Sequence, residues 1–418
     1  MTKTESALSE LPLELIDTIA QYTPICDLLY LCRTNRRING VCLRWICRTV
    51  AIHSPARLVA FCKTLISNVV CAKYVRTLLI HCYPQYILNV FYHLFRAALR
   101  NMESIESLEV SGSPELFSLF SGIHFPRLRD CSIPFSIDIV SFLQRHPKLT
   151  GLSLDPVPHD SVIDLSTLPP IHMPELQSFS GPEIVALSVI PRSRAASVLI
   201  FWDPRLMTNF LSVFETVAKS TIPVRELQNI LVSWDTSLLS AVATCIPGLT
   251  SLSIRNVSSI HAPLEMEEFF EHIDETLGAL QSLASLSIFQ GALPNSVDTD
   301  DLAWEFQTVR RWGERAPALV ACVLPSATRW VRIRANVWYP SGNSQSTEDM
   351  LARFRWFVTT VVAGAAVLPP EYTAVLEVIG GKEMVGAFKA AFEKEGVVPE
   401  FELAQKPAGI VMTFRPTE

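Results

Sequence analysis

One apolar spacing recurs along most of this 418-residue chain and constrains its fold more than any other feature. An apolar residue is followed by a second three positions later and by a third two positions after that. The clearest copies are Ile105/Leu108/Val110, Leu149/Leu152/Leu154, Leu249/Leu252/Ile254 and Leu283/Leu286/Ile288, and degenerate copies are Val75/Leu78/Ile80, Leu128/Cys131/Ile133, Leu176/Phe179/Gly181 and Leu227/Ile230/Val232. The shortest interval, from Leu128 to Leu149, is 21 residues, and such recurrence indicates an array of stacked repeats.

Helical segments lie between these copies. They span residues 136–146, 205–219, 235–246 and 264–280. Each repeat is therefore a short strand followed by a helix, and one such unit cannot bury its apolar residues alone. We expect the units to stack into an α/β solenoid, with the strands side by side in a curved parallel sheet and the helices outside. An ordinary α/β domain is the alternative.

Three regions follow from these patterns and from the chain length, which exceeds what one hydrophobic core usually supports. Residues 1–52 are expected to form a small helical domain, and residues 53–345 the repeat array. A polar stretch before residue 346 marks the next boundary. Strand, helix and strand patterns in residues 346–418 predict an α/β cap for the end of the array, and we assign no function to it.

Composition excludes several classes of function. No run reaches the roughly 18 apolar residues of a membrane helix, and the N-terminal residues lack a signal-peptide core, so we expect a soluble protein of the cytoplasm or nucleus. The net charge of -6 argues against a nucleic-acid partner and favours a protein partner. The ten cysteines lack metal-ligand spacing and are expected to be reduced thiols. No metal, cofactor or catalytic residue is expected, although an enzyme with an unrecognised site is an alternative.

The first fifty residues predict three short helices. On the first of them, Leu13, Leu15, Ile16, Ile19 and Ala20 form an apolar arc broader than one neighbouring helix covers. A core this small gives only marginal stability, and domains of this size are often stabilised by a partner or a neighbouring domain. The sequence therefore predicts an apolar docking face near the N-terminus. The alternative is that these leucines turn inward and the helices cap the repeat array.

Four short runs in this region carry a family resemblance. They are L-P-x-E-L-x-x-x-I at Leu11–Ile19, D-L-L-x-L at Asp27–Leu31, R-R-I at Arg36–Ile38 and R-W-I-C-R-T-V at Arg44–Val50. Together they resemble an F-box motif of the fungal kind. In that family the leading Leu-Pro and the spaced aliphatic residues contact a Skp-type adaptor, which carries over to Leu11, Pro12, Leu15, Ile19, Leu28 and Leu29. The chain departs from the family where Ile38 replaces a common aromatic residue and Trp45 follows later.

The repeats resemble the irregular leucine-rich repeats of fungal F-box proteins, which also lack a regular asparagine ladder. The resemblance implies a substrate-recognition subunit of an SCF-type (Skp, cullin, F-box) ubiquitin ligase. Such a subunit is not an enzyme: it binds a Skp-type adaptor, and through it a cullin, and holds a protein target nearby. The alternative is an F-box and repeat scaffold that acts outside ubiquitin ligation.

Residues that point away from the core of the array are the candidates for contact with a target. Period-two alternation assigns Glu109, Ser132, Ser153, Ser253 and Ser287 to this outer face, followed two positions along by residues such as Arg255 and Phe289. The segment 329–339 also alternates, with Val331 and Ile333 on one face. The other face carries Trp330, Arg332, Arg334 and Trp338. We hypothesise that this second face is exposed and binds an acidic or phosphorylated target segment. The alternative is an exposed edge strand on which arginine stacks against tryptophan for local stability.

Overall fold

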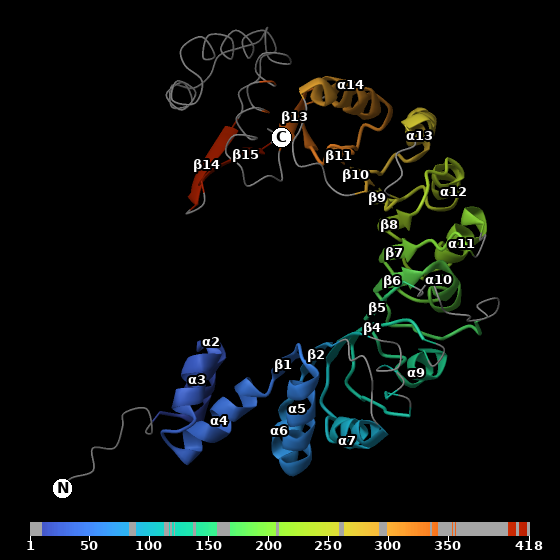
Figure 1. Cartoon of the computed structure of the whole chain (residues 1–418). Helices are drawn as coiled ribbons and strands as arrows, with labels where there is room; N and C mark the ends of the chain where they lie inside the picture. The colour runs from blue at the N-terminus through green and yellow to red at the C-terminus, as the bar shows by residue number, and fades with distance from the viewer. Residues whose placement is uncertain are drawn as a thin grey trace. The chain divides into compact units, whose positions relative to one another are not determined.

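The structure, a computed structural model, forms two compact units that are treated separately. Unit 1 comprises residues 1–197 and 219–222, and unit 2 comprises residues 198–218 and 223–418. Described residues are 11–82, 89–112, 117, 119–120, 122–136, 139–156, 168–205, 209–258, 263–291, 299–334, 337–341, 353, 356, 400–406 and 409–415. The chain is α/β with a mostly parallel sheet, as expected (Figure 1). The predicted region boundaries at 52 and 345 stay predictions.

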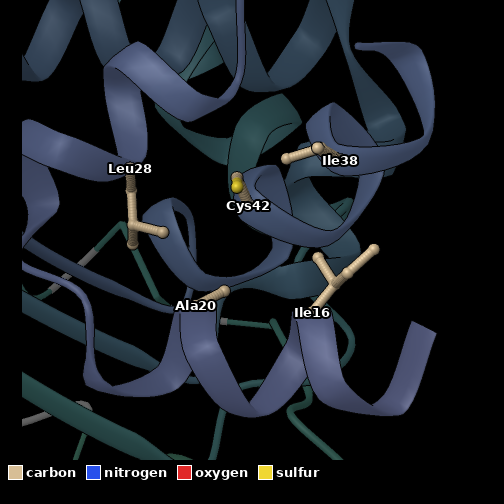
Figure 2. Packing of buried hydrophobic residues seen from close by; sticks show 5 residues of the cluster. All are labelled: Ile16, Ala20, Leu28, Ile38 and Cys42. Atoms are coloured by element: carbon tan, nitrogen blue, oxygen red, sulfur yellow. The ribbon is translucent and has the colours of Figure 1, made fainter. Parts of the chain in front are cut away.

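Unit 1 begins with three short helices, α2 (Leu13–Tyr22), α3 (Ile25–Leu31) and α4 (Arg36–Ile46). Pro12 and Pro24 precede the first two, where the missing backbone N–H is least costly. Asn35 caps α4, because its side-chain oxygen accepts a hydrogen bond from the backbone N–H of Arg37 at 2.8 Å. The shared core of these three helices consists of Ile16, Ala20, Leu28, Ile38 and Cys42 (Figure 2).

The remainder of unit 1 alternates strands with helices. Parallel strands lie side by side in chain order: β1 (Thr49–Ile52), β2 (Thr77–His81), β3 (Ser107–Ser111), β4 (Asp130–Ile133), β5 (Gly151–Leu154) and β6 (Ser178–Pro182). The helices are α5 (Pro55–Ser67), α6 (Val69–Tyr74), α7 (Asn89–Arg100), α9 (Ile139–Arg145) and α10 (Glu183–Val189). Residues of the repeated spacing face inward, as Ile105, Leu108 and Val110 illustrate with their full burial.

Unit 2 continues the same alternation and ends in antiparallel strands. Its strands are β7 (Ser197–Phe201, at the boundary), β8 (Glu226–Leu231), β9 (Ser251–Asn256), β10 (Ser285–Gln290), β11 (Ala321–Val323), β12 (Arg329–Arg334) and β13 (Val337–Ser341). Its helices are α11 (Phe210–Val217), α12 (Ser237–Cys245), α13 (Pro263–Thr276), η1 (Leu277–Ala279) and α14 (Thr299–Arg315). Strands β8 to β11 are parallel, whereas β12 pairs antiparallel with both β11 and β13.

The C-terminal region is described only in part. Strands β14 (Glu400–Lys406) and β15 (Gly409–Arg415) form an antiparallel pair. Arg353 and Trp356 are helical and buried. The rest of the predicted cap lies outside the described residues, so the expected order of strand, helix and strand stays a prediction.

One predicted repeat copy is out of register. The copy Leu227/Ile230/Val232 was expected to face the core, but Leu227, Asn229 and Leu231 are the buried residues of β8. Leu227 is aligned with Leu252 of β9, which is the second position of its own copy, so the true copy of β8 is Val224/Leu227/Asn229. A polar residue fills its third position. Asn229 is accommodated there because its side-chain oxygen accepts a hydrogen bond from Nε1 of the buried Trp202 at 3.0 Å.

A buried histidine makes the stability of unit 1 dependent on pH. Nε2 of His146 accepts a hydrogen bond from the backbone N–H of Phe125 at 2.9 Å, and Nδ1 lies 2.8 Å from the carbonyl oxygen of Phe142. The neutral ring with its proton on Nδ1 satisfies both contacts. Burial lowers the pKa of His146 to about 4. The folded state therefore resists the proton that the unfolded chain takes up near pH 6.5.

The sign of this effect follows from the two pKa values. Between about pH 6.5 and pH 4 the unfolded state binds more protons, so acidification favours unfolding. We expect the free energy of unfolding to fall from pH 7 to pH 5 by about 2 kcal/mol through this residue alone. Urea denaturation of His146→Gln should show a pH-dependent loss smaller by that amount, and His93→Gln, at an exposed residue of α7, should match wild type. Equal losses in wild type and His146→Gln would contradict the assignment.

Candidate functional site

The first two helices leave an unusual number of apolar side chains in water. Sixteen large apolar side chains are exposed among the described residues, and seven of them lie between residues 13 and 30. We call these seven the N-terminal apolar surface: Leu13, Leu15, Ile19, Tyr22, Ile25, Leu29 and Tyr30. Singly exposed apolar residues are ordinary in proteins, but their concentration on two neighbouring helices makes these helices a candidate interaction site.

Helical spacing explains why these residues are left out of the core. Ile16 and Ala20 lie one turn apart on the face of α2 that packs against the other two helices. Leu15, Ile19 and Tyr22 follow the i, i+4, i+7 pattern of a second face of α2. The short helix α3 contributes Leu28 to the core, so its neighbour Leu29 points elsewhere and is 51% exposed.

The six residues that the family resemblance predicts to contact the adaptor differ in how far they are exposed. Pro12, Leu15, Ile19 and Leu29 are exposed, and the exposed fraction is 51% for Leu15 and 42% for Ile19. Leu11 is half-buried against the core of the three helices. Leu28 is 4% exposed and belongs to that core, so the expectation that it offers its side chain to a partner is wrong (Figure 2). The physical reason is that α4 already covers the face of α3 on which Leu28 lies.

A polar network fixes the orientation of α2 on α4. Oδ1 of Asp17 accepts a hydrogen bond from Nε1 of Trp45 at 2.6 Å and another from the guanidinium group of Arg44. The guanidinium of Arg48 lies 5.0 Å from the centre of the Trp45 ring. Burial raises the pKa of Asp17, but the hydrogen bonds from Trp45 and Arg44 and the nearby positive charges outweigh it, so the pKa lies below its usual value.

This network was not recognised in the sequence. Asp17 lies on the polar side of α2, and its partners lie 27 and 28 residues further along the chain, so no local pattern joins them. It also gives Trp45 a role, since the indole contributes both a donor and a ring face. With α2 held in this way, the face of α2 that carries Leu15, Ile19 and Tyr22 is directed away from the helices' shared core.

The second candidate site, on β12 and β13, differs from expectation. Trp330 and Trp338 are fully buried, so the prediction that they lie on an exposed face is wrong. Helix α14 covers this face: Nε1 of Trp330 donates to Oε2 of Glu305 at 2.8 Å. At Gly313, also on α14, an added Cβ would lie only 2.8 Å from Cζ2 of Trp338.

Arg332 also differs from the exposed residue that was expected to bind a target. Arg332 is half-buried and donates through Nη1 to the carbonyl oxygens of Pro317 and Leu319, at 2.8 and 3.2 Å. Its guanidinium lies 5.8 Å from the Trp338 ring, so the expected arginine and tryptophan contact is present. It does not lie on an edge strand, because β12 has a neighbour on each side. The backbone of Arg334 is aligned with Val337, and its side chain lies outside the described set.

No family model matches the chain, and no curated protein matches it.

The described residues contain no cluster of metal ligands. No group of three or more His, Cys, Asp or Glu side chains suited to a metal ion occurs among them. All ten cysteines are free, and burial raises the pKa of Cys42 to about 11 and that of Cys62 to about 12. Both thiols therefore stay protonated at neutral pH, unlike an activated nucleophile. Within the described part of the chain, no helix has the length and apolar character needed to cross a membrane.

Proposed function

We propose that this chain is a substrate-recognition subunit of an SCF-type ubiquitin ligase, in which α2, α3 and α4 form an F-box that docks a Skp-type adaptor. A single observation carries the proposal: the N-terminal apolar surface stays exposed after the chain has folded. It lies on the two helices whose residues resemble the adaptor-contacting part of the F-box motif. An exposed apolar surface of this kind is stabilised when a second protein covers it.

The size of this surface sets a condition on the complex. Complete burial of a leucine or isoleucine contributes about 1.5–3 kcal/mol. Leu15, Ile19 and Leu29 are each half exposed, so covering all three contributes roughly 2–4 kcal/mol on the same scale. Micromolar affinity needs about 8 kcal/mol. Burial of these three residues alone falls short of that value, so we expect docking to cover further members of the surface, which are Leu13, Tyr22, Ile25 and Tyr30.

The target-binding part of the proposal rests on the repeats. In both units, buried apolar residues alternate along the strands with partly exposed residues, as in Leu108 and Val110 beside Glu109. We infer a leucine-rich-repeat-like solenoid whose open strand face is available for a protein target. In this function the chain breaks no bonds itself, and it acts by holding the target close to the machinery that transfers ubiquitin.

Affinity capture from cells that express a Skp-type adaptor and its cullin tests the proposal. Wild type is expected to capture both proteins, and the double variant Leu15→Asp, Leu29→Asp is expected to lose both. A suitable control is Val90→Asp, which adds a charge at an exposed valine on α7. Both aspartate sites are exposed, so the fold should survive. Substituting Leu11 would be less informative, because it packs against the core.

The presence of cullin distinguishes the two functions that the family resemblance allows. Adaptor and cullin captured together support a ligase subunit. Adaptor captured without cullin favours a scaffold that acts outside ubiquitin ligation. If wild type and the double variant capture equal amounts of adaptor, the N-terminal apolar surface is not the docking site and the proposal fails.

A further inference from the structure

A second exposed cluster lies on the strands of unit 2, far along the sequence from the three helices. We call it the Arg255 patch: Ile230 and Val232 at the end of β8, Arg255 and Val257 at the end of β9, and Phe289 near the end of β10. Strand register aligns Ile230 with Arg255 and Arg255 with Phe289. The valines lie just beyond, where the backbone N–H of Val257 donates to the carbonyl oxygen of Leu231 at 2.8 Å.

These residues belong to the face of the strands that the helices do not cover. Their neighbours along the strands, such as Leu231, Ile254 and Ile288, are buried, and successive side chains of a strand point to opposite faces. Val232 and Val257 are 39% and 49% exposed, Arg255 is exposed, and Ile230 and Phe289 are partly exposed. The patch therefore combines one cation with several apolar side chains in water.

The same strand positions in unit 1 have a different chemistry. The residue that follows the second buried position is His81 in β2, Ser111 in β3 and Asp155 after β5. In β8, β9 and β10 of unit 2 the equivalent residues are Ile230, Arg255 and Phe289. A solvent-facing strand surface needs neither aromatic nor aliphatic residues for the fold, and leaving them in water opposes solubility. Their concentration in three neighbouring strands indicates a contact surface.

The arginine is arranged to receive an anion. Its guanidinium carbon lies 5.1 Å from the centre of the Phe289 ring, which supports one face of the planar group. No carboxylate lies within ion-pair distance of Arg255 among the described residues. On the neighbouring strand β8, Ile230 is the residue aligned with Arg255, and Glu226 lies four residues before Ile230. By the rise of a strand this separation is roughly 13 Å. The N–H edge of a stacked guanidinium suits a carboxylate, which it binds through two parallel hydrogen bonds.

We propose that the Arg255 patch binds an extended peptide segment of the target in which an aspartate or glutamate lies next to apolar side chains. The carboxylate pairs with Arg255, and the apolar side chains of the segment cover Val232, Val257 and Phe289. A carboxylate fits better than a phosphate, because a phosphate dianion is usually held by more than one cation and the patch has one. This inference rests on the proposed function and names the chemical class of the target segment.

Selection from a displayed library of random twelve-residue peptides tests the inference on the purified full-length chain. We expect enriched peptides to carry Asp or Glu beside aliphatic or aromatic residues. Arg255→Glu should weaken binding of an enriched peptide at least about 30-fold, since a charge pair becomes a repulsion. Val257→Asp, at an exposed site, should also weaken it. The matched control Arg225→Glu makes the same charge change at an exposed residue next to the other end of β8 and should bind within about threefold of wild type.

Several outcomes would overturn the inference. These are enrichment of peptides without acidic residues, binding that needs a phosphorylated residue, equal binding by wild type and Arg255→Glu, or no enrichment at all. Adaptor capture by Arg255→Glu should equal that of wild type. If the chain fails to capture an adaptor but still binds acidic peptides through Arg255, the proposed ligase function fails and the peptide site stands. If an adaptor is captured but no acidic peptide binds, only the site assignment fails.

Discussion

Trp330→Ala is expected to lower the free energy of unfolding of the chain by about 3–5 kcal/mol. The indole is completely buried and packs against the rings of Phe306 and Trp356, at centroid distances of 5.9 and 5.7 Å. Truncation removes these contacts and leaves a cavity under α14. It also removes the Nε1 donor from Oε2 of the buried Glu305, which adds a desolvation cost. Urea denaturation followed by circular dichroism measures the change.

A second tryptophan provides the control for this experiment. Trp304 lies on the same helix, α14, but is 46% exposed. Trp304→Ala should cost about 1 kcal/mol, because much of its surface already meets water. If Trp330 were an accessible binding residue, as the alternation of its segment first suggested, Trp330→Ala would cost no more than Trp304→Ala. Equal costs would therefore contradict the burial of β12 under α14.

Neighbouring leucines on α3 should respond to alanine in opposite ways. Leu29→Ala is expected to lower adaptor affinity about tenfold or more and to leave stability nearly unchanged, because Leu29 is half exposed. Leu28→Ala is expected to lower the free energy of unfolding by about 2–5 kcal/mol, because Leu28 is enclosed by α2 and α4. Titration calorimetry with a purified Skp-type adaptor gives the affinities, and thermal unfolding gives the stabilities.

The same comparison of an exposed residue with a core residue can be made on helix α2, with Leu15 and Ile16. Leu15→Ala should weaken the adaptor complex, and Ile16→Ala should destabilise the three helices, because only Ile16 belongs to their core. A Leu29→Ala chain that unfolds as easily as Leu28→Ala would mean that Leu29 is packed inside the protein. The division of this region into a core face and a docking face would then be wrong.

The repeated apolar spacing predicted much of the fold because it reflects local geometry. Residues such as Leu108 and Val110 alternate with polar neighbours, and that pattern alone indicates a strand with one buried face. The register of β8 was missed because Asn229 occupies an apolar position, and its partner Trp202 is 27 residues earlier. A polar residue whose side-chain oxygen bonds to a distant indole leaves no local signal.

The candidate sites were harder to predict, since alternation defines two faces but does not say which is covered. In β12 both faces carry large residues, and the covering helix α14 was not recognised in the sequence. For α3, a helix of seven residues is too short for its periodicity to separate Leu28 from Leu29. The exposed surface of α2 was predictable, because its apolar arc is broader than its neighbours can bury.

Hydrogen–deuterium exchange of the full chain, with and without a purified Skp-type adaptor, tests the central claim most directly. The claim is that a partner covers the apolar side chains that α2 and α3 leave exposed. We expect complex formation to slow exchange in Leu13–Tyr22 and Ile25–Leu31, and the Leu15→Asp, Leu29→Asp variant to abolish that protection. Absence of a complex, or a complex in which exchange in both helices is unchanged, would contradict the claim.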